Sequence, residues 1–193
     1  MQKEETGGNK ILTRIMLWGA LLSFICLSLV HTDYIQKKFF YPLLYEKEIK
    51  EYADKNTVDA PLVAAVIKNE SHFVASAISK SGAVGLMQIM PETGVWIAEQ
   101  MGWEDFKENL LSEPSANIRL GCWYLSELKH EFKNEKAALA AYNAGRGHVR
   151  EWLENGKWDG EDINGIPFDE TRRYVQNVLE DKKTYGKLYK DSL

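Results

Sequence analysis

Apolar positions along this chain recur at helical spacing, and prolines and glycines punctuate them. Helices commonly begin near a proline and end near a glycine. The expected helices cover residues 43–56, 91–101, 114–132, 136–144, 148–153 and 169–185, and one more starts after Asp59, its expected N-cap, and carries Glu70 near its end. No convincing alternation of strand type accompanies them, and the length suits one domain. The sequence therefore predicts a mainly helical single domain.

The longest expected helix shows which face is buried. Ile118, Cys122, Leu125 and Leu128 form an amphipathic stripe, which is typical of core packing. Cys122 is interpreted as a small buried hydrophobe, and Cys26 lies in a separate apolar run, so no intramolecular disulfide is expected. The four histidines share no ligand spacing with the cysteines, so no metal site is expected.

An uncharged run of sixteen residues, Ile15–Val30, lies near the amino terminus. It is long for the apolar region of a signal peptide and short for a membrane span of about twenty residues, but Ile11 and Leu12 extend it if Arg14 snorkels. No small-residue cleavage site follows the run. We favour an uncleaved signal anchor over a removed signal peptide, and a buried core helix is the third reading.

Charge separates a basic leader from an acidic body. Residues 1–41 hold five Lys and Arg against three Asp and Glu, which gives a net charge of +2. Since the whole chain has a net charge of −4, the remaining residues carry −6. Nothing in this balance indicates binding to nucleic acid. A short amino-terminal tail before a large carboxyl-terminal domain favours a single-pass protein of the cell membrane with the domain outside the cytoplasm.

Glu70 is the first candidate for chemistry. Val63, Val66 and Ile67 lie seven, four and three residues before it and share its helical face, so Glu70 points toward the core. Burial and the negative end of the helix dipole both favour the protonated carboxyl, and catalytic carboxyls can be tuned to a pKa of roughly 6 to 7. The structural alternative is a Glu paired with a basic residue at the edge of the core.

Three short segments carry more polar chemistry than packing requires. They are Glu70-Ser71 with the glycine-bearing stretch 79–91, the segment Ala141-Tyr142-Asn143-Ala144-Gly145, and the segment Glu170-Thr171-Arg172-Arg173-Tyr174-Val175. Glycines keep the backbone close to whatever lies above it. Phenol, amide and carboxyl groups around an apolar cleft suit a neutral, hydroxyl-rich ligand such as a sugar chain.

The order E-S, G-L-M-Q-x-M-P, A-Y-N-A-G and E-T-R-x-Y-V resembles the soluble lytic transglycosylase family, whose catalytic domain has the goose-type lysozyme fold. The resemblance covers residues 44–185. It implies a tail and signal anchor at 1–33, a connector at 34–43, the catalytic domain at 44–185 and a tail at 186–193. One departure is Ala75, where the family often has proline, and it affects loop rigidity more than chemistry.

By resemblance, Glu70 is the catalytic acid and Ser71 a structural neighbour at the helix end. The substrate-binding residues that the resemblance implies are Ser79, Gln88, Met90, Tyr142, Asn143, Glu170 and Tyr174. Among them Tyr142 holds or assists the catalytic carboxyl. Three of these residues also have a purely structural interpretation. Asn143 could cap a helix, Glu170 could place a favourable negative charge at the amino terminus of its helix, and Tyr174 could belong to the core. Leu86 and Met87 are expected in the core.

The resemblance implies a reaction with one carboxyl, whereas most glycosidases use two. Glu70 would protonate the oxygen that links N-acetylmuramic acid to N-acetylglucosamine. It would then help the sugar's own 6-hydroxyl attack the anomeric carbon, giving a 1,6-anhydro product of peptidoglycan. Such a lytic transglycosylase needs no metal and no cofactor.

Three other functions stay open on the sequence. A muramidase of similar fold would hydrolyse the same bond with water. A non-catalytic peptidoglycan-binding component would only grip the glycan strand. A membrane-tethered helical interaction domain would neither cleave nor bind glycan. That reading leaves Gly82, Gly85 and the Met87-Gln88 pair without an obvious role.

Overall fold

The computed structural model describes residues 5–30 and 32–193, and the side chains of residues 5–11, 26 and 27 are outside that description. The chain divides into two compact units, residues 1–42 and 43–193. In chain order the helices are α1 (Glu5–Val30), α2 (Asp33–Ile35), the π-helix η1 (Gln36–Phe40), α3 (Glu46–Lys55), α4 (Ala60–Ser71), α5 (Pro91–Gln100), the 3-10 helix η2 (Glu108–Ser112), α6 (Pro114–Phe132), α7 (Glu135–Ala144), α8 (Arg146–Glu154), the 3-10 helix η3 (Ile163–Gly165) and α9 (Asp169–Leu188).

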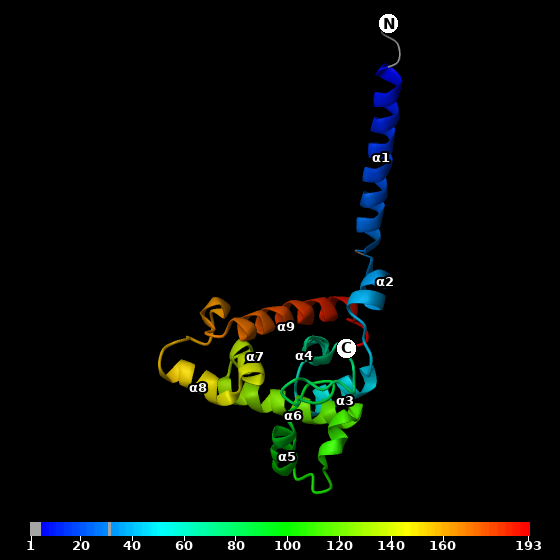
Figure 1. The fold of residues 1–193 in the computed structure, drawn as a ribbon. Coiled ribbons are helices and arrows are strands. Elements are labelled where there is room, and N and C mark those ends of the chain that lie inside the picture. The colour runs from blue at the N-terminus through cyan, green and yellow to red at the C-terminus, as the bar shows by residue number, and fades with distance from the viewer. Residues whose placement is uncertain (1–4, 31) are drawn as a thin grey trace. The chain divides into compact units, whose positions relative to one another are not determined.

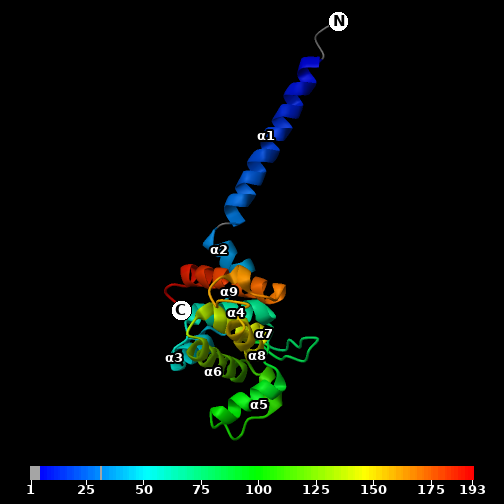
Figure 2. The same cartoon turned by 90° about the vertical axis from the view of Figure 1, so that its left-hand side faces the viewer.

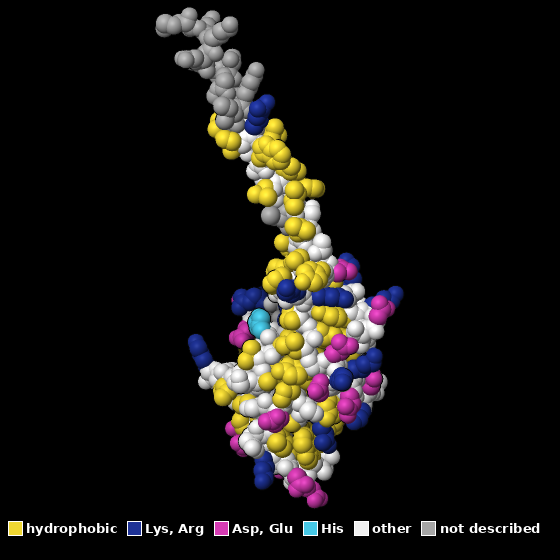
Figure 3. Space-filling model, turned by 90° about the vertical axis from the view of Figure 1, so that its right-hand side faces the viewer, with side chains coloured by type: hydrophobic (Ala, Val, Ile, Leu, Met, Phe, Trp, Pro, Cys, Tyr) yellow, Lys and Arg dark blue, Asp and Glu magenta, His cyan; other side chains and the backbone are white. Residues whose placement is uncertain are grey.

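The first unit is dominated by α1. Its segment Leu12–Val30 spans 19 residues with a mean hydropathy of 1.8 and is long and apolar enough to cross a membrane. Figure 3 shows apolar side chains along this helix, whereas charged and apolar side chains mix on the face of the larger unit. The predicted connector is helical over most of its length, as α2 and η1.

In the second unit, α9 and α6 run on opposite sides with α4 and α7 between them (Figure 1). The pairs in contact include α4 with α9, α7 with α9, and α6 with α3, α5 and α7. The predicted stripe of α6 is fully buried, at 0% exposure for Ile118, Cys122, Leu125 and Leu128. Burial also raises the pKa of the Cys122 thiol, so this cysteine behaves as a core hydrophobe.

A long loop joins α4 to α5 and runs out from the helices (Figure 2). Isolated antiparallel bridges pair Ile78 with Val84 and Val84 with Ile89, so the loop doubles back on itself. Asn117 of α6 is fully buried and holds the base of this loop through two hydrogen bonds. The Asn117 side-chain oxygen accepts from the Met87 amide at 2.7 Å, and the Asn117 side-chain nitrogen donates to the Val84 carbonyl at 3.0 Å. This loop is therefore anchored at its base by a residue of the core.

The predicted fold class is confirmed: the domain is mainly helical, and no strand is found in the described chain. Most predicted helix ends agree with the structure within a few residues, and Leu86 and Met87 are fully buried as expected. One local detail differs. Asp59 occupies the N-cap position of α4, but its side chain makes no capping hydrogen bond and pairs instead with Lys182 at 3.2 Å.

Candidate active site

Glu70 is the second-last residue of α4, and the helix end around it is held tightly. His72 adopts the left-handed conformation and closes the helix with its amide on the Lys68 carbonyl. The Ser71 hydroxyl lies within 3.2 Å of the Ile67 carbonyl and 2.8 Å of the Leu86 carbonyl. The second of these contacts ties the helix end to the loop, so the position of Glu70 is fixed relative to both.

The surroundings of Glu70 favour its protonated form. The pKa of the carboxyl is raised from 4.5 to about 7; burial is the largest cause, and the negative charge of Glu170 acts in the same direction. The Tyr174 hydroxyl acts in the opposite direction and lowers the pKa. Desolvation therefore outweighs the stabilisation of the carboxylate, and a substantial fraction of Glu70 is protonated at neutral pH.

Tyr174 and Tyr142 approach Glu70 from α9 and α7. The buried Tyr174 hydroxyl makes no hydrogen bond of regular geometry within the described chain, yet it is close enough to the Glu70 carboxyl to stabilise its ionised form. The Tyr142 hydroxyl donates instead to the Met87 carbonyl, at 2.7 Å. Burial, and then the charge of Glu70, raise the pKa of both phenols, so both tyrosines remain neutral donors.

The loop contributes Ser79, Gln88 and Met90, of which two are engaged with the loop itself. The Ser79 hydroxyl accepts from the Ala83 amide at 2.9 Å. The Gln88 side-chain nitrogen donates to the Gly85 carbonyl at 2.8 Å, and its backbone is left-handed, with φ of 47°. Met90 is half-buried at the N-cap of α5. Ser79 and Gln88 thus shape the loop, and within the described residues the hydrogen bonds of the Gln88 side chain are made by its nitrogen.

Asn143 and Glu170 line one surface depression of about 590 Å³, together with Thr171 and the segment 167–169. The Thr171 hydroxyl donates to the Asn143 side-chain oxygen at 2.7 Å, which joins the carboxyl end of α7 to the first turn of α9. Glu170 is exposed there and lies close enough to Glu70 for its charge to act on it. One residue that lines the depression is therefore within electrostatic reach of Glu70.

The structure brings Glu70, Tyr142, Tyr174 and Glu170 together and gives Ser79, Gln88 and Asn143 contacts that hold the surrounding backbone. The sequence analysis did not predict the role of Asn117 in holding the loop or the hydrogen bond from Thr171 to Asn143. Asn117 could have been noticed as a polar residue on an apolar helix face, and Thr171 as a hydroxyl within a functional motif. Among the described residues, no group of three or more His, Cys, Asp or Glu could hold a metal ion.

Comparison with known proteins identifies the class. A family model described as the transglycosylase SLT domain matches residues 47–164, and one described as the soluble lytic transglycosylase helical domain matches residues 165–193. The chain belongs to the transglycosylase SLT domain family. The resemblance inferred from the motifs is therefore confirmed.

Curated relatives include soluble and membrane-bound proteins. The soluble lytic murein transglycosylase of Salmonella typhimurium is 38% identical over 152 residues, covering 76% of this chain and 23% of that protein. The membrane-bound lytic murein transglycosylase F of Desulfosudis oleivorans is 36% identical over 174 residues, covering 80% of this chain and 35% of that protein. The chain thus spans about a quarter to a third of the length of these relatives.

Solved structures share the fold. The 70 kDa soluble lytic transglycosylase of Escherichia coli aligns with a TM-score of 0.73 and 34% identity, over 79% of this chain and 25% of that chain. An inactive Glu-to-Gln variant of lytic transglycosylase Slt from Pseudomonas aeruginosa aligns with a TM-score of 0.73 and 32% identity, over 94% of this chain and 30% of that chain. The lysozyme-like fold expected from the motifs is confirmed.

Proposed function

We propose that this protein is a peptidoglycan lytic transglycosylase in which Glu70 is the single acid and base. The observation that carries the proposal is a carboxyl whose burial raises its pKa to about 7, beside two neutral tyrosines. A general acid works best when its pKa is near the operating pH. An inactive Glu-to-Gln variant of a structural relative supports a glutamate as the essential group.

In the first step, protonated Glu70 donates its proton to the oxygen between N-acetylmuramic acid and N-acetylglucosamine. The bond from the anomeric carbon to that oxygen breaks, and N-acetylglucosamine leaves with the proton as a free hydroxyl. Glu70 becomes a carboxylate, which the adjacent Tyr174 hydroxyl stabilises.

In the second step, the Glu70 carboxylate removes the proton from the 6-hydroxyl of the same N-acetylmuramic acid, and that oxygen bonds to the anomeric carbon. The products are a 1,6-anhydro sugar and a regenerated acid, with no water consumed. The proton returns to Glu70, and the negative charge of Glu170 favours that return. The remaining predicted residues, Ser79, Gln88, Met90, Tyr142 and Asn143, hold or line the glycan cleft.

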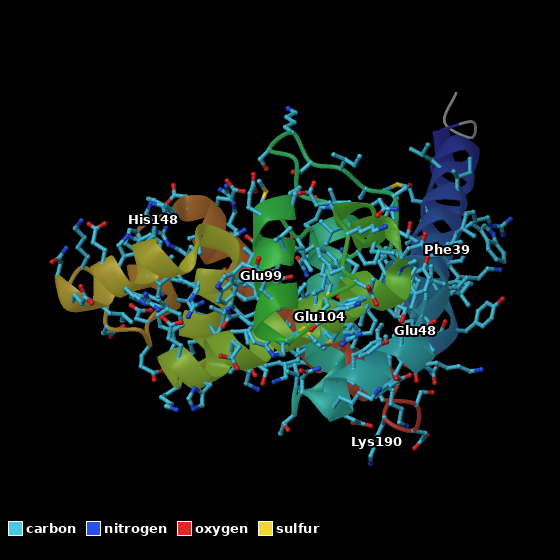
Figure 4. The ribbon with its side chains drawn as sticks, turned by 90° about the horizontal axis from the view of Figure 1, so that it is seen from below. Phe39, Glu48, Glu99, Glu104, His148 and Lys190 are labelled. Atoms are coloured by element: carbon cyan, nitrogen blue, oxygen red, sulfur yellow. The ribbon has the colours of Figure 1, made fainter. Side chains whose placement is uncertain are left out.

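The test of Glu70 uses the full chain in mild detergent with insoluble peptidoglycan. The Glu70→Gln variant is expected to lose at least about 100-fold in the release of soluble fragments, because removal of a general acid typically costs that much. Glu99→Gln is the control, since Glu99 is exposed on α5 (Figure 4). Equal release by the Glu70 variant would contradict Glu70 as the acid, whereas no release by either the parent or the variant would favour a non-catalytic glycan-binding component.

We also propose that α1 anchors the protein in the cell membrane with residues 43–193 on the extracytoplasmic side. The segment Leu12–Val30 supports the anchor by length and hydropathy, and membrane-bound relatives exist. Cell fractionation should find the protein in the membrane pellet, and protease added to spheroplasts should digest the larger unit. Recovery in the soluble fraction would contradict the anchor.

Glu170 favours a second candidate, a muramidase. Its carboxylate comes near Glu70 from another helix, and a second carboxylate can activate water in hydrolytic glycosidases. In that case the product would carry a reducing end. The mass of the product separates the two reactions.

A further inference from the structure

The end of the first unit, residues 33–40, has an exposed aromatic surface. It is formed by α2 and η1 and is called the juxtamembrane segment below. The structure describes all of its residues, and none of them is buried. Tyr34 is 67% exposed, Phe39 64% and Phe40 48%. Aromatic rings that gather in this way on a surface mark a site of interaction with another molecule or with a membrane.

Hydrogen bonds attach this segment to the end of α1. The last carbonyls of a helix have no partner within the helix itself. Here the Thr32 hydroxyl donates to the Leu29 carbonyl at 2.8 Å. The Gln36 side-chain nitrogen donates to the Val30 carbonyl, also at 2.8 Å. Because these carbonyls are satisfied by the chain, they need no water where an apolar helix leaves a membrane. The segment therefore continues directly from the proposed membrane anchor.

Basic charge accompanies the aromatic rings. The Lys38 ammonium lies 5.6 Å from the centre of the Tyr34 ring and 5.5 Å from the centre of the Phe39 ring. Lys37 is the second lysine of the segment, and Asp33 is its one acidic residue. Aromatic side chains are enriched at membrane interfaces, and lysines near the surface are attracted by anionic lipid headgroups. This combination fits a bilayer interface that contains anionic lipids.

The charge of the rest of the chain makes this attraction specific to the segment. Residues 42–193 carry a net charge of −6. A unit with that charge gains nothing overall from an anionic surface and is weakly repelled by it. Attraction to such a surface must therefore come from the aromatic rings and lysines that follow α1.

We propose that the juxtamembrane segment binds the membrane interface, with its aromatic rings among the headgroups and its two lysines beside anionic lipids. This proposal rests on the proposed anchoring by α1. Only residues 41 and 42 separate the segment from the larger unit. Binding of the segment to the membrane would therefore favour the cleavage of glycan strands that lie next to the membrane.

The test uses the full chain reconstituted in vesicles of phosphatidylcholine and phosphatidylglycerol. Hydroxyl radicals formed by radiolysis oxidise aromatic side chains that water reaches, and mass spectrometry measures the rate at each ring. Phe168 of the larger unit, which is 44% exposed, is the reference within the same molecules. In water Phe39 should be oxidised at least as fast as Phe168, because more of its side chain is exposed.

In the vesicles, Phe39 should be oxidised roughly tenfold more slowly than Phe168, because burial of a phenylalanine side chain is worth at least that factor. Lipids that carry a photoactivatable group near the headgroup should form adducts with residues 34–40. A rate for Phe39 equal to that of Phe168 would overturn the proposal. Protection without lipid adducts would overturn it as well, because protein would then cover the rings.

Lys38→Gln tests the contribution of charge. A lysine at an anionic surface contributes enough for this variant to lower the protection of Phe39 about fivefold. In vesicles of phosphatidylcholine alone the variant should match the parent. Lys107→Gln is the control, since it removes one exposed positive charge from the larger unit and should leave Phe39 protected. Equal protection in the parent and both variants would contradict contact between Lys38 and anionic headgroups.

Flotation of the vesicles separates this proposal from the anchor on which it rests. A chain that does not float has no anchor, and the proposal fails with it. A chain that floats while Phe39 is oxidised as fast as Phe168 keeps the anchor, and only the binding of the segment fails. None of these measurements uses turnover, so a failure of the proposed reaction appears separately in the mass of the products.

Discussion

At Glu70, burial that would normally destabilise a protein keeps a carboxyl partly protonated at neutral pH. Because the proposed reaction needs the protonated carboxyl, kcat/KM should fall as pH rises through about 7, the raised pKa of this group. A pH–rate profile on soluble glycan strands checks this expectation. An alkaline limb centred near the ordinary glutamate pKa of about 4.3 would contradict it.

Two neighbours should move that midpoint in opposite directions. Tyr174→Phe removes a hydroxyl that lowers the Glu70 pKa, so the midpoint should rise. Glu170→Gln removes a negative charge that raises the pKa, so the midpoint should fall. Tyr142→Phe is the matched control, because that hydroxyl donates to the Met87 carbonyl. Shifts in the same direction for Tyr174 and Glu170 would show that these residues do not act through the charge of Glu70.

Stability should respond to the same group. The folded-state pKa of about 7 lies above the unfolded value of 4.5, so the folded protein binds more protons between these limits. The stability associated with protonated Glu70 is present below pH 4.5 and lost as pH rises through 7. Glu70→Gln should therefore become more stable than the parent by up to about 3 kcal/mol above pH 7. Denaturant titrations at pH 4 and pH 8 measure this difference, and an equal difference at both values would contradict it.

The sequence predicted a buried carboxyl with a raised pKa at Glu70, because one helix and its local pattern contain the relevant information. It could not show that the Tyr142 hydroxyl contacts Met87, or that Tyr174 stands beside Glu70, because those distances depend on how α7 and α9 pack. The substrate-binding roles of these residues stay predictions.

Among the elements, the loop between α4 and α5 depends on close backbone approach at Gly85. A Cβ there would collide with the Leu111 carbonyl and the Asn117 side chain, whereas a Cβ on Gly82 would meet open space. Both glycines have positive φ, of +84° and +91°. Gly82→Ala should cost about 1 kcal/mol from backbone strain alone, and Gly85→Ala roughly 2 to 4 kcal/mol because overpacking adds to the strain. Denaturant unfolding of the two variants checks this, and equal losses would contradict it.

The α4–α9 pair has an ionic clamp close to Glu70. Asp181 of α9, only 6% exposed, accepts from Lys68 and from Asn69 of α4, each at 2.7 Å. Asp181→Ala leaves Lys68 partly buried without this carboxylate and should cost about 3 kcal/mol. The control is Glu51→Ala, which breaks the exposed pair of Glu51 with Lys55 and should change stability by less than about 1 kcal/mol. Thermal unfolding measures both, and similar losses for the two variants would contradict a structural role of the clamp.

Helix positions were largely predictable because apolar periodicity, prolines and glycines act locally. The clamp was not, since Lys68 and Asp181 are 113 residues apart in the chain and look like ordinary surface charges in the sequence. The 3-10 helix η2 was also missed, because five residues hold too little periodicity to stand out from a loop.

For the whole molecule, an apolar helix and a compact helical unit were both foreseen from composition and pattern. The larger unit has the fold of much longer relatives, and its candidate site is assembled from α4, α7, α9 and the loop after α4. Anchoring and strand cleavage are proposals about how these parts work together.

The most direct test is mass spectrometry of the products that the full chain releases from peptidoglycan, beside the Glu70→Gln variant. A transglycosylase gives disaccharide products lighter by one water than those of a muramidase, because the 6-hydroxyl takes the place of water. We expect anhydro products that disappear in the variant. Reducing-end products from the parent protein would contradict the intramolecular reaction and establish hydrolysis.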